Sequence, residues 1–209
     1  MTEPLDLFAE APDLDTIREQ AAACTRCELY EHSTQTVFGV GPTRARLVMV
    51  GEQPGDQEDR QGAPFVGPAG RLLDQALDAA GIARDDAYVT NAVKHFNFRY
   101  QGKRRIHETP KAPHITACRP WLEAELAAVA PQVLLTLGAT AGKSLLGAKF
   151  RITAERGEPR SWNDMTLVPT IHPSAILRAD RARGQDRDEM MAGFVADLEV
   201  AGGLLVARG

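Results

Sequence analysis

Four short apolar runs alternate along the chain with segments of helical composition. Each run is rich in β-branched residues and ends in a polar or glycine-containing loop, which is typical of a buried strand. Strands that alternate with helices form parallel or mostly parallel sheets with helices on both faces. We therefore expect an α/β fold, a three-layer α/β/α sandwich with a central, mostly parallel four-stranded sheet. The expected strands are 46–51, 87–91, 133–138 and 165–172, and the expected helices are 13–23, 71–80, 115–129, 139–146 and 187–200.

The chain's length and composition predict a single domain. It has 209 residues, of which 44% are hydrophobic, and no repeat or linker divides it. This is enough for a full core and short enough for one domain over residues 1–209, of which 1–12 are expected to be an acidic, flexible leader. The start is acidic, unlike a secretory signal, and no apolar run approaches the ~18 residues of a membrane span. We therefore expect a cytoplasmic, monomeric protein without membrane contact.

The three cysteines, Cys24, Cys27 and Cys118, point to a metal centre or a cluster. An odd number of cysteines in a reducing compartment does not predict structural disulfides. The Cys-x-x-Cys pair brings two thiolates within reach of one metal centre, and Cys118 offers a third ligand. A fourth ligand must come from elsewhere in the chain.

Four loops are expected to leave the same edge of the sheet, at 51–67, 91–107, 138–141 and 172–178. Open α/β sheets bind ligands at this edge. The glycines and prolines of 51–70 are expected to prevent regular structure, and 150–162 is expected to be irregular or strand-like. Neither the Gly-x-x-x-x-Gly-Lys-Ser/Thr nor the Gly-x-Gly-x-x-Gly pattern occurs, which argues against those nucleotide sites. The polar residues expected to converge, together with Phe65, are Glu52, Gln53, Asp56, Asn91, His107 and His172.

The stretch 94–107, KHFNFRYQGKRRIH, fits neither strand nor helix periodicity. It carries five Lys and Arg residues with Phe96, Phe98 and Tyr100 interleaved. This composition is typical of a segment that contacts a nucleic acid backbone and stacks on bases, although a solvated surface loop is the alternative. Because the net charge of the chain is −4, the stretch is a positive island rather than part of a protein that coats nucleic acid.

The motifs at these strand ends resemble those of the uracil-DNA glycosylase superfamily. GEQPG at 51–55 and PFVGPAG at 64–70 are similar to the first active-site motif of the family 4 iron–sulfur glycosylases, and His-Pro-Ser at 172–174 is similar to the second. Asn91 matches their uracil-reading Asn. KRRIH at 103–107 resembles the signature of the X-type glycosylases, which excise uracil and become covalently attached to the abasic product. The resemblance spans about residues 24 to 180.

The resemblance implies a 4Fe–4S cluster on Cys24, Cys27, His95 and Cys118. Family 4 members place a cysteine where this chain has His95. Imidazole replaces thiolate on the iron of Rieske centres, so the departure is chemically acceptable. Zinc on the same ligands is the alternative that spacing alone suggests. We expect a structural role for the cluster.

The resemblance also implies how uracil is held in DNA that is single-stranded or has a flipped base. Phe65 is expected to stack on the base, and Asn91 to pair with its O4 and N3–H. Glu58 is expected to exclude a thymine methyl group. Backbone N–H groups near Gly55 and Asp56 are expected to stabilise the departing anion.

Catalysis is expected to involve two histidines. His172 would donate a hydrogen bond to uracil O2, and His107 would attack C1′ as a neutral imidazole. Glu52 would orient His107 and accept its other proton, and Gln53 would help to position these groups. The alternatives are a turnover-competent iron–sulfur glycosylase and a non-catalytic module that binds single-stranded DNA or senses redox state.

Uracil-containing DNA, with single strands preferred, is the expected partner. Basic residues on the insert and after the last strand would contact phosphates, and Ile176 and Leu177 would enter the vacated base stack. A solvated face and a core position are the respective alternatives, and the arginines of the insert could instead pack back and hold it. The residues assigned to DNA contact are Lys103, Arg104, Arg105, Ser174, Ile176, Leu177 and Arg178.

Overall fold

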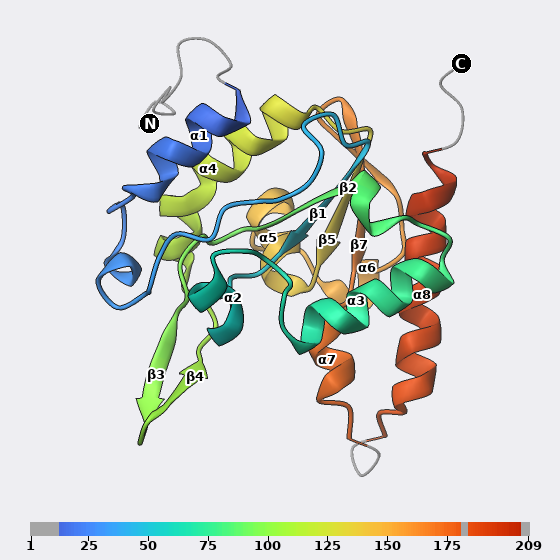
Figure 1. Cartoon of the computed structure of the whole chain (residues 1–209). Helices are drawn as coiled ribbons and strands as arrows, with labels where there is room; N and C mark the ends of the chain where they lie inside the picture. The colour runs from blue at the N-terminus through green and yellow to red at the C-terminus, as the bar shows by residue number, and fades with distance from the viewer. Residues whose placement is uncertain (1–12, 181–183, 206–209) are drawn as a thin grey trace.

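The computed structural model describes residues 13–180 and 184–205 (Figure 1), so the predicted leader lies outside the described residues. Its main sheet has five strands in the order β2-β1-β5-β7-β6. The first four are parallel to one another, and β6 is antiparallel to β7. The strands are β1 Leu47–Gly51, β2 Ala87–Asn91, β5 Val133–Leu137, β6 Arg160–Trp162 and β7 Met165–Thr170. The α/β sandwich and all four expected strands are confirmed, and β6 adds a fifth strand at the sheet edge.

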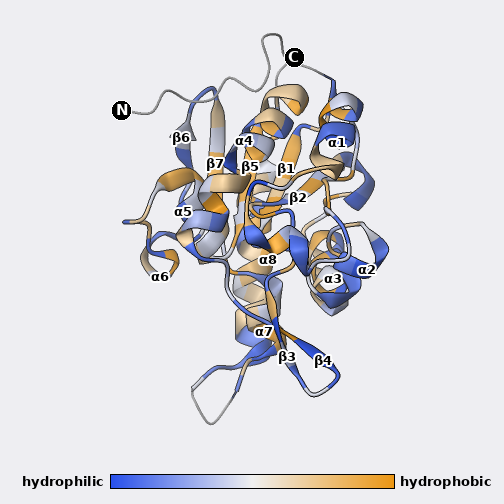
Figure 2. Cartoon of the chain, turned by 90° about the vertical axis from the view of Figure 1, so that its left-hand side faces the viewer, coloured by the Kyte–Doolittle hydropathy of each residue, from blue (hydrophilic) through white to orange (hydrophobic). Residues whose placement is uncertain are grey.

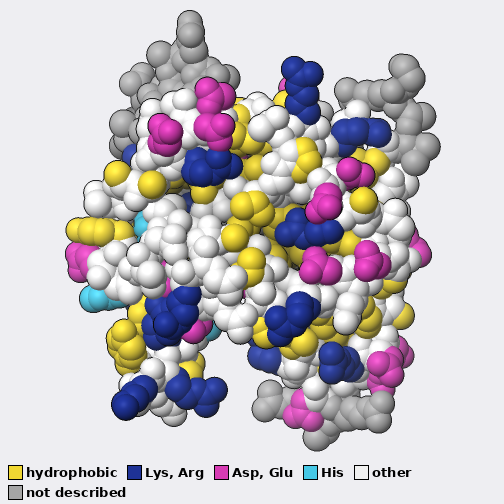
Figure 3. Space-filling view, in the orientation of Figure 1, with side chains coloured by type: hydrophobic (Ala, Val, Ile, Leu, Met, Phe, Trp, Pro, Cys, Tyr) yellow, Lys and Arg dark blue, Asp and Glu magenta, His cyan; other side chains and the backbone are white. Residues whose placement is uncertain are grey.

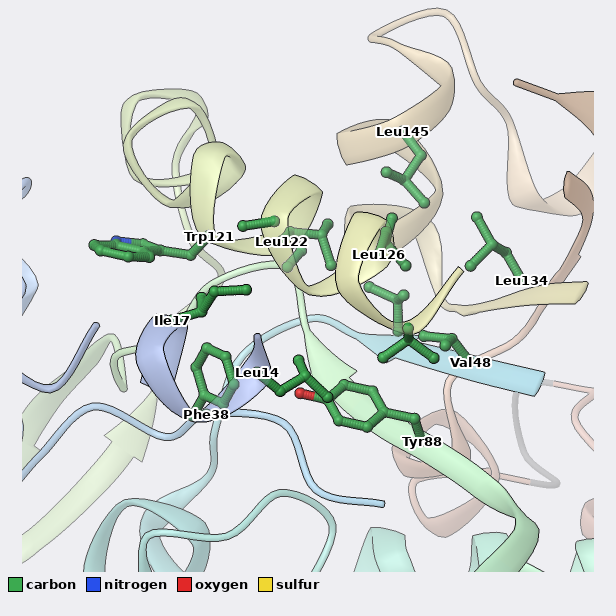
Figure 4. Close-up of a cluster of buried hydrophobic side chains, with 14 of the residues drawn as sticks. Leu14, Ile17, Phe38, Val48, Tyr88, Trp121, Leu122, Leu126, Leu134 and Leu145 are labelled. Carbon is green, nitrogen blue, oxygen red and sulfur yellow. The ribbon is translucent and has the colours of Figure 1, made fainter. Parts of the chain in front are cut away.

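Helices cover both faces of this sheet (Figure 1). The side of β1 that carries Val48 and Val50 shares a core with α1, α4 and α5 (Figure 4), and the side that carries Leu47 and Met49 shares a core with α3, α7 and α8. This alternation follows from the two-residue period of a strand. The helices are α1 Leu14–Ala22, α2 Asp56–Gln61, α3 Pro68–Ala79, α4 Ala112–Val129, α5 Ala139–Leu146, α6 Ile152–Glu155, α7 Pro173–Leu177 and α8 Arg187–Gly203, with 3₁₀ turns at Glu28–Glu31 and Arg84–Asp86.

In the described ranges 13–180 and 184–205, no helix is both long and apolar enough to cross a membrane. The central strands are largely hydrophobic, whereas α2 and the projecting hairpin are largely hydrophilic (Figure 2).

Two segments expected to lack regular structure are ordered. The glycine-rich loop contains α2, which begins after Gly55 and ends at Gly62, a left-handed C-cap with φ 75°. The basic insert forms an antiparallel hairpin of β3 (Phe98–Gln101) and β4 (Arg104–His107). Gly102 has φ 61° and is the first of the hairpin's two turn residues, as a type II′ turn requires. Both expectations were wrong because elements of only 6 residues (α2) and 4 residues (β3 and β4) are too short to show a clear periodicity.

A fully buried ion pair joins the segment after β2 to helix α4. Lys94 Nζ contacts Glu125 Oε2, and it donates to Thr90 Oγ1 at 2.7 Å and to the Asn91 carbonyl at 2.8 Å. Glu125 Oε1 accepts from Tyr88 Oη at 2.9 Å. The pair therefore fixes the backbone of the residue that ends β2.

Candidate active site

The carboxyl ends of β1, β2, β5 and β7 meet at one pocket of about 860 Å³. In the sheet, β2 lies on one side of β1, and β5, which comes later in the chain, lies on the other side. The strand order therefore reverses at β1, and the pocket lies at this switch point of the sheet. The predicted site residues that line it are Glu52, Gln53, Gly55, Asp56, Glu58, Phe65, Asn91, His107, His172, Ser174, Leu177 and Arg178. The predicted convergence of the four loops is therefore confirmed.

Asn91 and Phe65 lie together above Gly51 in this pocket. A Cβ atom on Gly51 would lie 2.3 Å from Asn91 Oδ1 and 2.7 Å from Phe65 Cζ. Phe65 has φ 57°, in the left-handed region that a bulky side chain rarely adopts, and such strain is concentrated at functional sites. Gly70 allows α3 to approach, since a Cβ there would lie 1.6 Å from the Phe65 carbonyl oxygen. The lack of a side chain at Gly51 and Gly70 thus leaves the space that the Asn91 amide and Phe65 occupy.

Replacing Gly51 with alanine is expected to displace both side chains. The rate of base release at limiting protein should fall by about 100-fold, because a misplacement of about 1 Å costs that much. Single-turnover kinetics with uracil-containing strands measures this rate. Gly203→Ala is the matched control, since nothing lies within 4 Å of a Cβ at that position. Full activity of Gly51→Ala would contradict the geometry.

His172 follows β7 and faces Phe65, with ring centroids 5.8 Å apart. Its Nδ1 accepts the Ser174 backbone N–H at 3.1 Å. Burial lowers the pKa of His172 to about 4, so the ring is neutral at pH 7. Because Nδ1 accepts, the single ring proton lies on Nε2, which makes that nitrogen a donor.

Glu52 follows β1 and lies between two partners. His107 Nε2 lies 3.1 Å from Glu52 Oε1, and Thr140 Oγ1 donates to Oε2. Burial is the largest influence and acts to raise the pKa of Glu52, but the hydrogen bonds from His107 and Thr140, together with the electrostatic effects of His107 and His172, leave the pKa lower than usual. Sequence reasoning missed Thr140, although its position within the loop 138–141 and its hydroxyl group were available signals.

Gln53 fixes the root of the hairpin that carries His107. Its Nε2 donates to the carbonyls of Asn97 and Glu108, both at 3.1 Å, and its Oε1 accepts the Asn97 N–H at 3.0 Å. These contacts span the beginning of β3 and the end of β4. Gln53 therefore positions His107 through the backbone.

Comparison with known proteins identifies the family. Residues 38–199 match the model of the Uracil DNA glycosylase superfamily. The chain belongs to this superfamily. It is similar to the type-4 uracil-DNA glycosylase of Thermotoga maritima, with 40% identity over 79% of this chain and 83% of the relative.

Two further relatives carry the same description. The type-4 uracil-DNA glycosylase of Sulfurisphaera tokodaii is 36% identical over 78% of this chain and 76% of its own length. That of Pyrobaculum aerophilum is 31% identical over 90% of this chain and 96% of its own length. The similarity to superfamily members therefore extends over nearly the whole chain.

Arg105 departs from its expected role as a phosphate contact. Its side chain is 8% exposed and is paired with Asp56 and Asp59 of α2. The guanidinium carbon also lies 5.4 Å from the ring centroid of Phe96 and 5.0 Å from that of Phe98. The phosphate assignment was wrong, because Arg105 packs back and anchors the hairpin to α2.

Lys103 and Arg104 are exposed on the same hairpin and remain predicted phosphate contacts. Lys and Arg side chains gather on the projecting hairpin, and the molecule is hollowed between the hairpin and the side that carries α7 (Figure 3).

Ile176 and Leu177 of α7 were both predicted to enter the vacated base stack, but only Leu177 is accessible. Ile176 is 0% exposed and belongs to the core with α3 and α8, so its assignment to DNA contact was wrong. Leu177 is 40% exposed and lines the pocket together with Arg178, and both remain predicted contacts. Ser174 contacts His172, and its DNA contact also remains a prediction.

Glu58 braces the glycine-rich loop with both carboxylate oxygens. Oε2 accepts the Gly55 N–H at 3.0 Å, and Oε1 accepts the Gly67 N–H at 2.9 Å. The Gly55 N–H is thus engaged by Glu58, while Gly55 itself lines the pocket, and its contact with uracil remains a prediction. The Asp56 N–H and the exclusion of thymine by Glu58 remain predictions.

The predicted cluster ligands lie in one region, between α1, α4 and the segment before the hairpin. A hydrogen bond with Cys118 lowers the pKa of the Cys27 thiol to about 6, and Cys24 Sγ accepts from Trp121 Nε1 at 3.1 Å. His95 Nδ1 is buried without a hydrogen-bond partner. Within 13–180 and 184–205, no three His, Cys, Asp or Glu side chains are arranged to hold a metal ion. The donor types and the orphaned imidazole nitrogen nevertheless suit a metal centre.

Proposed function

We propose that the chain is a uracil-DNA glycosylase, which cleaves the bond between uracil and C1′ of its deoxyribose. The observation that carries the proposal is the convergence of the Asn91 amide and the His172 Nε2–H in one pocket. One group can read the base, and the other can stabilise it as a leaving group. The relatives' names describe this activity in other organisms. The substrate is single-stranded DNA or a flipped nucleotide, because a stacked base cannot enter such a pocket.

Asn91 selects uracil by its hydrogen-bonding pattern. The amide N–H₂ donates to uracil O4, and the amide oxygen accepts from N3–H. Cytosine presents a donor at position 4 and a lone pair at N3, so it leaves both groups of Asn91 unpaired as long as the amide keeps this orientation. Phe65 stacks on the base and fixes its plane.

Cleavage leaves the electrons of the broken bond on uracil. His172 donates its Nε2–H to O2, and the Asp56 N–H at the start of α2 adds a second donor. Because the pKa of His172 is about 4, the group that meets the anion is a neutral imidazole already oriented by Ser174. No proton needs to move before the bond breaks.

We further propose that His107 captures C1′ before water does, as in the X-type glycosylases that the KRRIH segment resembles. One nitrogen of the neutral ring forms the bond to C1′ while the bond from C1′ to uracil N1 breaks. The electron pair of the broken bond leaves with uracil. The proton on the other ring nitrogen passes to Glu52. Imidazole on C1′ is a poor leaving group, so the product persists as an adduct. One chain suffices for the reaction, because every group named lies in the same pocket.

The activity is tested with a single-stranded oligonucleotide that contains one uracil. Free uracil and an SDS-resistant complex are both measured, with a thymine strand as control. We expect both products from the uracil strand and neither from the control. Uracil without a complex would make the protein a turnover-competent glycosylase, and DNA binding without release of uracil would make it a non-catalytic module.

We also propose that Cys24, Cys27, His95 and Cys118 hold a 4Fe–4S cluster. When bound, the cluster supplies a cross-link between the end of α1, helix α4 and the base of the hairpin. The support is the chemistry of three thiols and a buried imidazole nitrogen without a partner in one region.

Purified protein is expected to be yellow-brown, with absorbance near ~400 nm and about four iron atoms per chain. His95→Ala should lose most of the iron, whereas His95→Cys should retain it. His32→Ala, at an exposed position, is the control. Measurement of the iron and zinc content of the purified protein distinguishes a 4Fe–4S cluster from zinc. Colourless protein that contains zinc would contradict the cluster.

A further inference from the structure

We propose that Thr140 is a positioning residue, which holds Glu52 so that His107 rather than water captures C1′. The inference rests on the proposed covalent reaction and assigns a role to a residue that no motif in the sequence marks. Its basis is the line of contacts from Thr140 through Glu52 to His107.

The two oxygens of the Glu52 carboxylate have different partners. An ionised carboxylate only accepts hydrogen bonds, so the Thr140 hydroxyl is the donor to Oε2. Oε1 is left to face His107 Nε2 at 3.1 Å. Thr140 is 8% exposed and is the second residue of α5, so its donor has a fixed position. The β-branched side chain also has few rotamers.

Among residues 13–180 and 184–205, His107 has no comparable support for its ring. It is 47% exposed at the end of β4, and its tilted contact with Phe96 has a centroid distance of 6.2 Å. The orientation of the imidazole therefore depends on Glu52, and the orientation of Glu52 depends on Thr140. Of the three interacting groups, the Thr140 hydroxyl is the one whose position is fixed by a packed helix, α5.

The charged state of Glu52 depends on the same contacts. The ionisable groups that act on it are His107 from β4 and His172 before α7, and burial opposes its ionisation. His172 is neutral at pH 7 and supplies no fixed positive charge. The Thr140 hydroxyl donates a hydrogen bond that favours the ionised form of Glu52 over the protonated form. Glu52 must be ionised to accept the proton of His107.

Thr140→Val keeps the branched shape and removes the hydroxyl, whereas Thr140→Ser keeps the hydroxyl. The rate of adduct formation should fall about 10- to 100-fold in Thr140→Val, the range for losing a hydrogen bond to a charged group. Release of uracil should fall much less, so free uracil should exceed adduct. Thr140→Ser should restore the wild-type ratio to within a few-fold. Equal thermal unfolding midpoints would show that the fold is intact.

Rapid-quench measurement of both products from one uracil-containing strand tests the inference. A wild-type ratio in Thr140→Val would overturn it, as would equal losses of both products. Thr140→Ser that is as impaired as Thr140→Val would assign the effect to packing and also overturn it. Wild-type protein that releases uracil without forming an adduct refutes the inference but not the glycosylase, and wild-type protein that releases no uracil refutes both.

Discussion

His107→Ser is expected to lose the SDS-resistant complex and still release uracil. The reason is that His107 supplies the nucleophile, while the groups that read and stabilise the base, Asn91 and His172, lie on other elements. With the imidazole gone, water captures C1′ and the protein turns over. We expect adduct to fall below detection, at least about 1,000-fold under wild type, on the scale of losing a nucleophile.

Arg104→Ser is the matched control, because Arg104 is exposed on the same strand and contacts neither Glu52 nor α2 in the hydrogen bonds and ion pairs of the described residues. It should form the adduct, with weaker DNA binding at raised salt. Gel electrophoresis after heating in SDS measures the complex, and chromatography measures free uracil. An SDS-resistant complex in His107→Ser would assign the bond to another residue.

The second large effect is on stability. Lys94→Met is expected to lower the free energy of unfolding by about 3–5 kcal/mol, because it leaves the Glu125 carboxylate buried without its cation. Both side chains are fully buried, so solvent cannot compensate. Chemical denaturation of the purified protein measures the change.

The double variant Lys94→Met/Glu125→Gln separates charge from packing. The glutamine side chain would be neutral and would keep an acceptor for the Tyr88 hydroxyl and the Gly39 N–H, which Glu125 now serves. We therefore expect the double variant to recover most of the lost stability. A double variant that is no more stable than Lys94→Met would contradict the charge explanation.

The sheet was predictable because each central strand is apolar on both faces and ends at a polar residue or glycine. Leu47 to Val50 are buried on both sides of β1, and such continuous apolar runs mark interior strands. The pocket was predictable for the same reason, since the carboxyl ends of parallel strands meet at one edge. Glu52, Asn91 and His172 follow directly from that rule.

The side-chain partners could not be predicted in this way. The sequence shows that Arg105 is basic, but its pairing with Asp56 and Asp59 depends on α2, which lies between two glycines and was not expected. Ile176 and Leu177 are adjacent and chemically alike, yet the turn of α7 buries one and exposes the other. Thr140 acquires its role only from a contact with a residue 88 positions away.

The most direct test of the covalent reaction is the intact mass of the protein after incubation with a short single-stranded oligonucleotide that contains one uracil. We predict a mass gain equal to that of the abasic strand, located by peptide mapping to the segment that contains His107. An unchanged protein mass together with complete release of uracil would contradict the account.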